Sequence, residues 1–116
     1  MNNEKYWKAL EHLVSTSKII IDRPKGTRHP TATQIIYPLD YGYLEGTSAG
    51  DGEGIDVWLG TQKERQVDAI ICSVDLTKRD AEIKILIGCT EQEKETIHKF
   101  HNQLEPISGM LIKRSK

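Results

Sequence analysis

The sequence predicts a mainly β fold of the α+β class, compatible with a small OB-like β-barrel that carries an N-terminal and a C-terminal helix. Three observations support this: amphipathic segments near both ends, short β-branched apolar runs between them, and turn residues that separate these runs. The pattern alone leaves a β-sandwich or an α+β sheet equally compatible. With 116 residues, the chain is long enough for one domain, residues 1–116, and too short for two.

Two segments have helical periodicity. Apolar residues recur on one face over Glu4–Ser15, which predicts a helix packed on the domain. Thr90 is followed three residues later by Glu93, the spacing of an N-terminal capping box, and an apolar stripe continues to about Gln103. A proline then blocks further helix, and residues 109–112 are compatible with either an edge strand or a packed tail.

The strands are expected between these helices. β-branched residues favour a strand over 18–22, and pairing should resume at 34–37 after a loop that contains two prolines and a glycine. Further strands are expected at 56–59, 67–76 and 81–89. A polar tetrad between the last two predicts a hairpin.

Composition and charge exclude several classes of partner. The formal net charge is −1, and the 16 basic residues are spread along the chain, so we expect no nucleic-acid partner. The longest apolar runs are far too short for a membrane span, and the first residues lack the apolar core of a signal peptide. We therefore expect a cytoplasmic protein with no membrane partner. A homo-oligomer is compatible with the sequence, which does not decide the oligomeric state.

Two cysteines, Cys72 and Cys89, lie in apolar strand-like runs. Without a secretion signal, a pair of buried thiols is the better interpretation than a disulfide or a catalytic thiol.

The most informative segment places three carboxylates, Asp51, Glu53 and Asp56, within six residues on a glycine-rich connection that enters an apolar strand. Carboxylate oxygens suit hard divalent cations, whereas a zinc or copper site would bring histidine or cysteine into the cluster. Residues two apart on an extended chain point to one face, and a bulge or turn at Gly54 would bring Asp56 toward the same ion. The alternative is a solvated acidic turn. Like charges this close favour a neutralising cation.

The preceding segment, Tyr37–Thr47, reads Tyr-Pro-Leu-Asp-Tyr-Gly-Tyr-Leu-Glu-Gly-Thr. Together with the acidic run it resembles the signature of the soluble (family I) inorganic pyrophosphatases, whose acidic run has the form Asp-x-Asp-x-hydrophobic-Asp-hydrophobic. The resemblance covers Tyr37 to Val57. It implies an OB-type barrel and hydrolysis of inorganic pyrophosphate by a metal-activated water, in a chain shorter than the usual members.

The resemblance also implies roles for individual residues. Asp51 and Asp56 match metal-binding aspartates, with Mg²⁺ as the expected cofactor and Mn²⁺ as the alternative. Glu53 stands where the family has the aspartate thought to act as general base, and it is one methylene longer. Glu82 and Lys84 fit an acid and lysine pattern on a strand, with Glu82 as a metal ligand and Lys84 on phosphate.

Weaker matches place further residues. Asp80 stands for another metal-binding aspartate, and Asp75 competes with it because the loop length does not fix the register. Asp22 would occupy a metal-facing acidic position. Tyr41 is an equally good candidate for a phosphate contact and for a structural hydroxyl. Phosphate charge would come from three neighbouring basic residues: Arg23, Lys25 and Arg28.

Two departures from the family pattern favour a rival function. The hairpin that the family carries before Tyr37 is missing with its basic residues, and His101-Asn102 stands where the family has a tyrosine and a lysine. His101 itself fits a packed histidine better than a ligand. The rival to pyrophosphate hydrolysis is a non-catalytic or weakly catalytic module that binds metal and a phosphate or nucleotide. Hydrolysis of another small phosphoanhydride, such as a nucleotide, is also compatible, because loss of the hairpin would widen the pocket.

Overall fold

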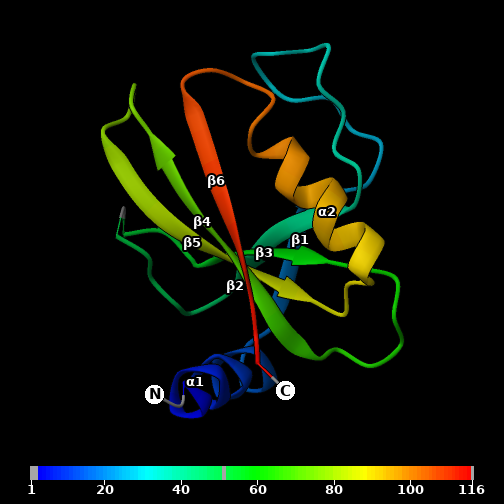
Figure 1. Cartoon of the computed structure of the whole chain (residues 1–116), viewed down its shortest axis with the longest axis vertical. Coiled ribbons are helices and arrows are strands. Elements are labelled where there is room, and N and C mark those ends of the chain that lie inside the picture. Colours follow the sequence, from blue (N-terminus) through cyan, green and yellow to red (C-terminus); the bar gives the residue numbers. More distant parts are fainter. Residues whose placement is uncertain (1–2, 51, 116) are drawn as a thin grey trace.

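The structure is a computed structural model that describes residues 3–50 and 52–115. Its elements follow in the order α1 (Glu4–Ser15), β1 (Ile19–Arg23), β2 (Asp40–Leu44), β3 (Asp56–Leu59), β4 (Val67–Asp75), β5 (Asp80–Ile87), α2 (Glu91–Phe100) and β6 (Ile107–Lys113). The strands form one sheet of order β1-β2-β3-β5-β4-β6 (Figure 1). The β3–β5 pair is parallel and the other four pairs are antiparallel. The mainly β class is confirmed, but β1 and β6 end the sheet, so it is not closed into a barrel.

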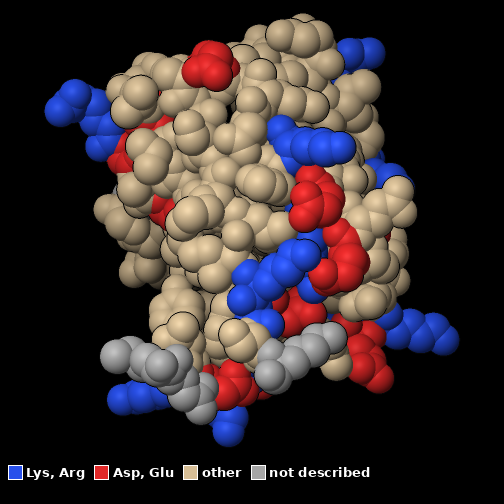
Figure 2. All heavy atoms as spheres, viewed as in Figure 1, with Lys and Arg blue, Asp and Glu red and all other residues tan. Residues whose placement is uncertain are grey.

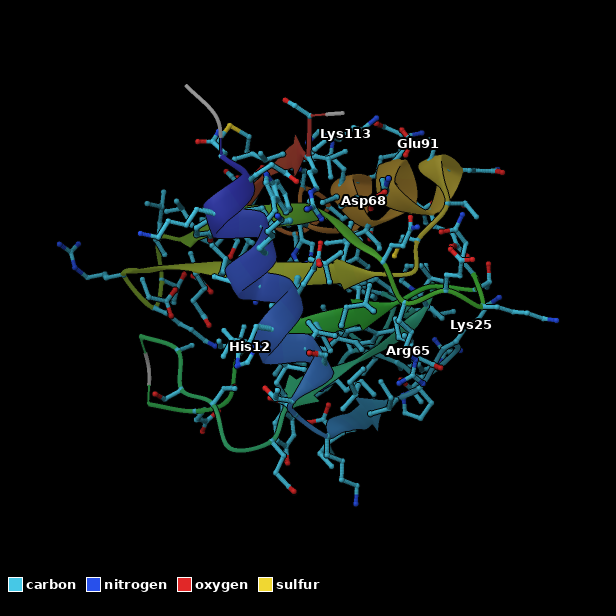
Figure 3. All side chains as sticks on the ribbon, turned by 90° about the horizontal axis from the view of Figure 1, so that it is seen from below. His12, Lys25, Arg65, Asp68, Glu91 and Lys113 are labelled. Atoms are coloured by element: carbon cyan, nitrogen blue, oxygen red, sulfur yellow. The ribbon has the colours of Figure 1, made fainter. Side chains whose placement is uncertain are left out.

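The helix α1 crosses one face of the sheet (Figure 3). Its apolar stripe, Trp7, Leu10 and Val14, is buried, as the helical periodicity predicted. The stripe belongs to a cluster of buried residues that includes six from the sheet: Leu44, Val57, Val67, Ile70, Ile85 and Ile87.

The helix α2 covers the opposite face, where a second buried cluster forms around Trp58. Successive strand residues alternate between the two clusters, so Val57 packs under α1 and Trp58 under α2. Because both faces are covered there, the segments 57–59 and 85–87 are continuous apolar runs instead of alternating ones. The predicted capping box is confirmed, since the Glu93 amide donates to Thr90 Oγ1 at 3.1 Å and the Thr90 amide donates to Glu93 Oε1 at 2.9 Å.

The predicted strand at 34–37 is wrong. This segment makes one isolated bridge, between Arg28 and Ile36, and otherwise folds as a loop. The proline after it has no N–H to donate to a ladder. Pairing resumes instead in β2, where Gly42 lies opposite β1 so closely that a Cβ there would stand 1.8 Å from the carbonyl oxygen of Ile20. The tyrosine–glycine motif is therefore itself a strand.

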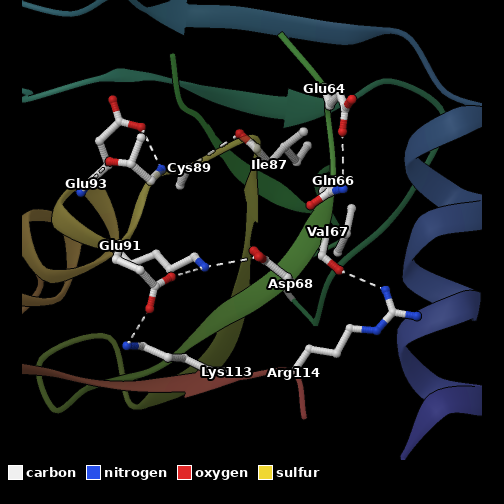
Figure 4. A network of polar contacts seen from close by, with 12 residues as sticks. Glu64, Gln66, Val67, Asp68, Ile87, Cys89, Glu91, Glu93, Lys113 and Arg114 are labelled. Carbon is white, nitrogen blue, oxygen red and sulfur yellow. Dashed lines mark hydrogen bonds and ion pairs between the residues drawn. The ribbon is translucent and has the colours of Figure 1, made fainter. Parts of the chain in front are cut away.

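A polar network ties both helices to the sheet (Figure 4). The buried ammonium of Lys94 contacts Glu91 and lies 3.0 Å from Asp68, and Lys113 lies 2.9 Å from Glu91. Arg114 binds a glutamate of α1 at 2.7 Å. Acidic and basic side chains are accordingly interspersed on the face shown in Figure 2. Within residues 3–50 and 52–115, no helix is long and apolar enough to cross a membrane.

Candidate functional site

A cleft of about 900 Å³ opens between the β4–β5 hairpin, the loops before β2 and β3, and the segment after α2. It gathers most of the residues that the sequence predicted for a metal and phosphate site. Eight of the eleven line it: Asp22, Arg23, Tyr41, Glu53, Asp56, Asp80, Glu82 and Lys84. Asp51 lies outside the described residues. Lys25 and Arg28 do not line this cleft.

The cleft carries an excess of negative charge. Seven carboxylates line it against three lysine or arginine side chains, which gives the lining a net charge of about −4. The carboxylates are Asp22, Glu53, Asp56, Asp75, Asp80, Glu82 and Glu105, and the cations are Arg23, Lys78 and Lys84. A polyanion entering alone would be repelled, so such a cleft suits either a cation or an anion that arrives with one.

The centre of the cleft is an ion pair between neighbouring parallel strands. The β3–β5 register pairs Val57 with Ile85, so the residues before them, Asp56 and Lys84, are side by side. Lys84 Nζ lies 2.9 Å from Asp56 Oδ2, and the Lys84 side chain is only 12% exposed. Lys84 thus neutralises the carboxylate that the sequence predicted as a metal ligand.

Tyr41 completes this centre from β2. Its hydroxyl hydrogen-bonds the Asp56 carboxylate, and its ring centroid lies 5.8 Å from Lys84 Nζ. Burial raises the pKa of the Tyr41 hydroxyl well above its usual range, and the charge of Asp56 adds to the effect. Tyr41 is therefore a neutral donor that holds the carboxylate in place. A phosphate contact of Tyr41 stays a prediction.

The donor chemistry of the cleft fits a hard divalent cation, because its excess charge comes from carboxylates. Among the described residues, however, no three Asp, Glu, His or Cys side chains converge as a ready ligand set. Asp56 is instead paired with Lys84.

Arg23 is positioned by a residue to which the sequence analysis gave no role. Arg23 Nη1 donates to the hydroxyl of Tyr37 at 2.9 Å, and the guanidinium carbon lies 5.6 Å from the centroid of that ring. Tyr37 is only 5% exposed, so it is a fixed anchor for Arg23. The signal was present in the sequence, since Tyr37 opens the tyrosine–glycine motif.

His29 is a second residue that the sequence analysis missed. Its Nδ1 accepts hydrogen bonds from the backbone amides of Thr31 at 3.2 Å and Ala32 at 3.1 Å. Because Nδ1 is an acceptor, the ring proton resides on Nε2. Burial lowers the pKa of His29, and the charges of Arg23 and Lys78 add to this effect. His29 therefore lines the cleft as a neutral imidazole.

The hairpin between β4 and β5 separates the two competing aspartates. Asp75 Oδ1 accepts from the amides of Thr77 at 2.9 Å and Lys78 at 3.1 Å, which makes Asp75 part of the turn. Asp80 lies opposite Asp75 in the ladder. Both line the cleft. The turn bonds occupy Asp75, so Asp80 is the better candidate ligand.

The two basic residues outside the cleft are exposed and make local contacts. The backbone amide of Lys25 donates to Asp40 Oδ1 at 2.8 Å, and Arg28 Nη1 donates to the carbonyl oxygen of Thr33 at 2.9 Å. Nothing in these contacts directs either side chain toward the cleft.

His101 lines the cleft, but a nitrogen of its ring is already hydrogen-bonded to a core residue. Its Nε2 accepts from Trp58 Nε1 at 2.9 Å, and only 7% of the residue is exposed. Burial lowers the pKa of His101 to about 3. The imidazole is neutral near pH 7, so it supplies no positive charge to an anion.

A larger hollow, of about 1,030 Å³, lies between α1 and β4. Three of its charged side chains bind one another, because Arg114 is paired with both Glu4 and Glu11. The predicted site residues do not line it. We therefore place the candidate site in the 900 Å³ cleft.

No protein-family model and no curated protein sequence matches the chain. Solved structures do. An inorganic pyrophosphatase from Helicobacter pylori superposes with a TM-score of 0.66 at 12% identity, over 82% of each chain. An inorganic pyrophosphatase from Coxiella burnetii superposes with a TM-score of 0.65 at 17% identity, over 82% of this chain and 84% of that one. An inorganic pyrophosphatase from Neisseria gonorrhoeae superposes with a TM-score of 0.57 at 20% identity, over 84% of this chain and 79% of that one. This chain therefore has the fold of the inorganic pyrophosphatases.

Proposed function

We propose that this chain hydrolyses inorganic pyrophosphate with the help of a divalent cation, Mg²⁺ or alternatively Mn²⁺, in the 900 Å³ cleft. The observation that carries the proposal is that most of the predicted site residues lie in one cleft. Eight residues assigned to such a site from the sequence come from separate segments of the chain and line one cleft. The shared fold agrees with this activity but does not establish it, since one fold supports many functions.

The excess negative charge of the cleft explains why a cation is needed. Pyrophosphate is itself a polyanion, and a lining with four more carboxylates than cations would repel it. Asp56, Asp80 and Glu82 would hold the cation, together with Asp51. Bound there, a divalent ion would neutralise phosphate charge and lower the pKa of a bound water toward neutrality.

The basic side chains of the cleft would bind the phosphates. Arg23 presents planar donors that suit phosphate oxygens, and its bond to Tyr37 fixes where they lie. Lys84 would exchange its contact with Asp56 for a phosphate oxygen. Glu53 would accept the proton of the attacking water. Its side chain is one methylene longer than aspartate, and a misplacement of about 1 Å costs on the order of a hundredfold in rate.

One observation favours a second function, that of a module that binds metal and phosphate without turnover. The carboxylate at the centre of the cleft is already neutralised by Lys84. If Lys84 and Asp56 stay paired, the chain would bind a phosphoanhydride weakly and hydrolyse it slowly.

The decisive measurement is phosphate release from pyrophosphate by purified protein, with and without Mg²⁺, together with calorimetric titration of Mg²⁺. Asp56→Asn should weaken Mg²⁺ binding and reduce release at least a hundredfold. Glu45→Gln removes an exposed carboxylate outside the cleft and should change neither. Mg²⁺ binding that depends on Asp56 without any phosphate release would select the binding module. No Mg²⁺ binding at millimolar concentration would refute both.

Glu53 has its own test. Glu53→Gln should keep the affinity for Mg²⁺ and lose most of the rate, because the amide cannot accept the proton. Glu53→Asp restores the length that the family uses and should match or exceed the rate of the unmodified chain. A Glu53→Gln variant that turns over normally would remove this residue from the mechanism.

A further inference from the structure

The cleft has an apolar end that pyrophosphate does not need. Besides the charged residues, it is lined by apolar side chains from α2, from the connection between α2 and β6, from the start of β6 and from the loop after β1. Five side chains at this end are uncharged and none of them is fully buried, while the exposed Glu105 lies between two of them in the chain. The five are Pro30, Phe100, Leu104, Pro106 and Ile107.

Aromatic rings connect this apolar end to the charged centre. The ring of Tyr41, beside Lys84, lies 5.5 Å from that of Tyr37, which lies 5.0 Å from Phe100. The His29 imidazole is parallel to Tyr37, with 3° between the planes and 6.2 Å between the centroids. Because the Nδ1 hydrogen bonds keep this imidazole neutral, it adds a flat ring without charge to the wall.

A bare diphosphate would use only part of this cleft. Cavities of about 300 to 1,000 Å³ typically enclose drug-sized ligands, and this one, at about 900 Å³, lies near the upper end of that range. Pyrophosphate is much smaller and gains nothing from apolar contact. A ligand that carries both a phosphoanhydride and a planar organic group would bury apolar surface as well as bind charge.

We propose, resting on the function proposed above, that the cleft also hydrolyses a nucleoside polyphosphate and prefers it to pyrophosphate. Its terminal phosphates lie at Lys84 and Arg23, and its base packs against the apolar end at Phe100 and Ile107. In the reaction, water adds its oxygen to the terminal phosphorus and the bridging P–O bond breaks. The shortened nucleotide leaves with the bridging oxygen, and the proton of the water passes to Glu53.

Binding of non-hydrolysable compounds tests this inference independently of turnover. Calorimetry in Mg²⁺ would compare a β,γ-methylene nucleoside triphosphate with methylenediphosphonate, which has the phosphorus backbone but no base. We expect the nucleotide to bind at least tenfold more tightly. Phosphate release from the triphosphate should likewise exceed release from pyrophosphate in kcat/KM.

Two truncations on the same strand give a matched control. Ile107 lines the cleft, whereas Ile112 lies outside it and is 36% exposed. Ile107→Ala should reduce the ratio of the two affinities about fivefold, since it removes apolar contact with the base. Ile112→Ala should leave that ratio unchanged. Leu104→Ala provides a second truncation of the apolar end if Ile107→Ala does not fold.

The outcomes separate this inference from the proposed function. If methylenediphosphonate binds as tightly as the nucleotide, or if neither Ile107→Ala nor Leu104→Ala changes the affinity ratio, the nucleotide inference is wrong and pyrophosphate hydrolysis stands. If neither compound binds in Mg²⁺, both proposals are wrong.

Discussion

Lowering the pH from 7 to 5 should reduce the free energy of unfolding by about 2 kcal/mol through His101 alone. In the folded chain, this imidazole accepts from Trp58 Nε1 at 2.9 Å and is almost completely buried. Burial is the main cause that lowers its pKa to about 3, and the positive charge of Lys84 adds to it. In the unfolded chain the same group titrates near its ordinary value of 6.5.

The direction of this change in stability follows from the difference in bound protons between the unfolded and the folded chain. Between pH 6.5 and about 3, the unfolded chain binds a proton at His101 that the folded chain does not, so stability falls as the pH falls. Above pH 6.5 the contribution is complete. Each pH unit below 6.5 costs about 1.4 kcal/mol, which gives about 2 kcal/mol at pH 5. The folded pKa lies well below pH 5, so the unfolded value sets this magnitude.

Guanidinium unfolding followed by tryptophan fluorescence and circular dichroism at pH 7 and pH 5 would measure the effect. His101→Gln removes the titrating group while its amide oxygen can still accept from Trp58. This variant should lose most of the difference between the two pH values, with a remainder from His29, whose pKa is also lowered. His98→Gln, on the more exposed side of α2, should behave like the unmodified chain.

An equal loss of stability in the unmodified chain and in His101→Gln would refute the argument. It would mean that His101 is solvated or charged in the folded protein. Such a result would also affect the site, because a charged His101 at the inner end of the cleft could contact a phosphate. If the prediction holds, positive charge for the substrate near pH 7 must come from residues such as Lys84 and Arg23.

Three further predictions concern stability. Hydrogen bonds to two lysines lower the pKa of Glu91 from its ordinary 4.5 to about 2. The contribution of Glu91 to stability is therefore complete above pH 4.5 and is lost as the pH falls toward 2. Glu91→Gln should reduce the pH dependence of the thermal unfolding midpoint between these two values. The carboxamide of Asn102 makes two hydrogen bonds with the backbone of β6, at 3.0 and 3.1 Å, and Asn102→Ala should cost about 1 to 2 kcal/mol in urea unfolding. Replacing both Cys72 and Cys89 by alanine should lower stability by about 1 to 3 kcal/mol through lost packing and leave phosphate release unchanged with or without reductant, since neither thiol lines the cleft.

Elements with a strong pattern could be predicted from the sequence, and elements defined by tertiary contacts could not. The bounds of α1 and β3 match the prediction because their apolar periodicity is not interrupted. The segment 34–37 has equally good strand composition, yet it folds as a loop, where Tyr37 enters the aromatic cluster. The strand β2 was missed because its glycine and its two tyrosines match a motif better than a strand pattern.

The candidate site divides in the same way. Its acidic residues could be predicted because they lie in short contiguous motifs. The pairing of Asp56 with Lys84 depends on the parallel register of β3 and β5, which the sequence does not display. The neutral state of His101 depends on its contact with Trp58, which lies 43 residues away in the chain. Properties that decide the charge of a site are set by contacts between segments, so a motif locates the site and leaves its charge state undetermined.

The ion pair of Asp56 and Lys84 makes the binding of cation and substrate interdependent under the proposed function. A cation that binds Asp56 alone must displace Lys84 and leave an ammonium, whose side chain is 12% exposed, without its partner. A phosphate that binds Lys84 alone leaves the carboxylate unpaired in the same way. When both ligands bind, each charge exchanges one partner for another. The two should therefore bind with positive coupling, and by linkage each must raise the affinity for the other by the same factor. A cleft with four excess negative charges would then bind each ligand more weakly alone than in the presence of the other.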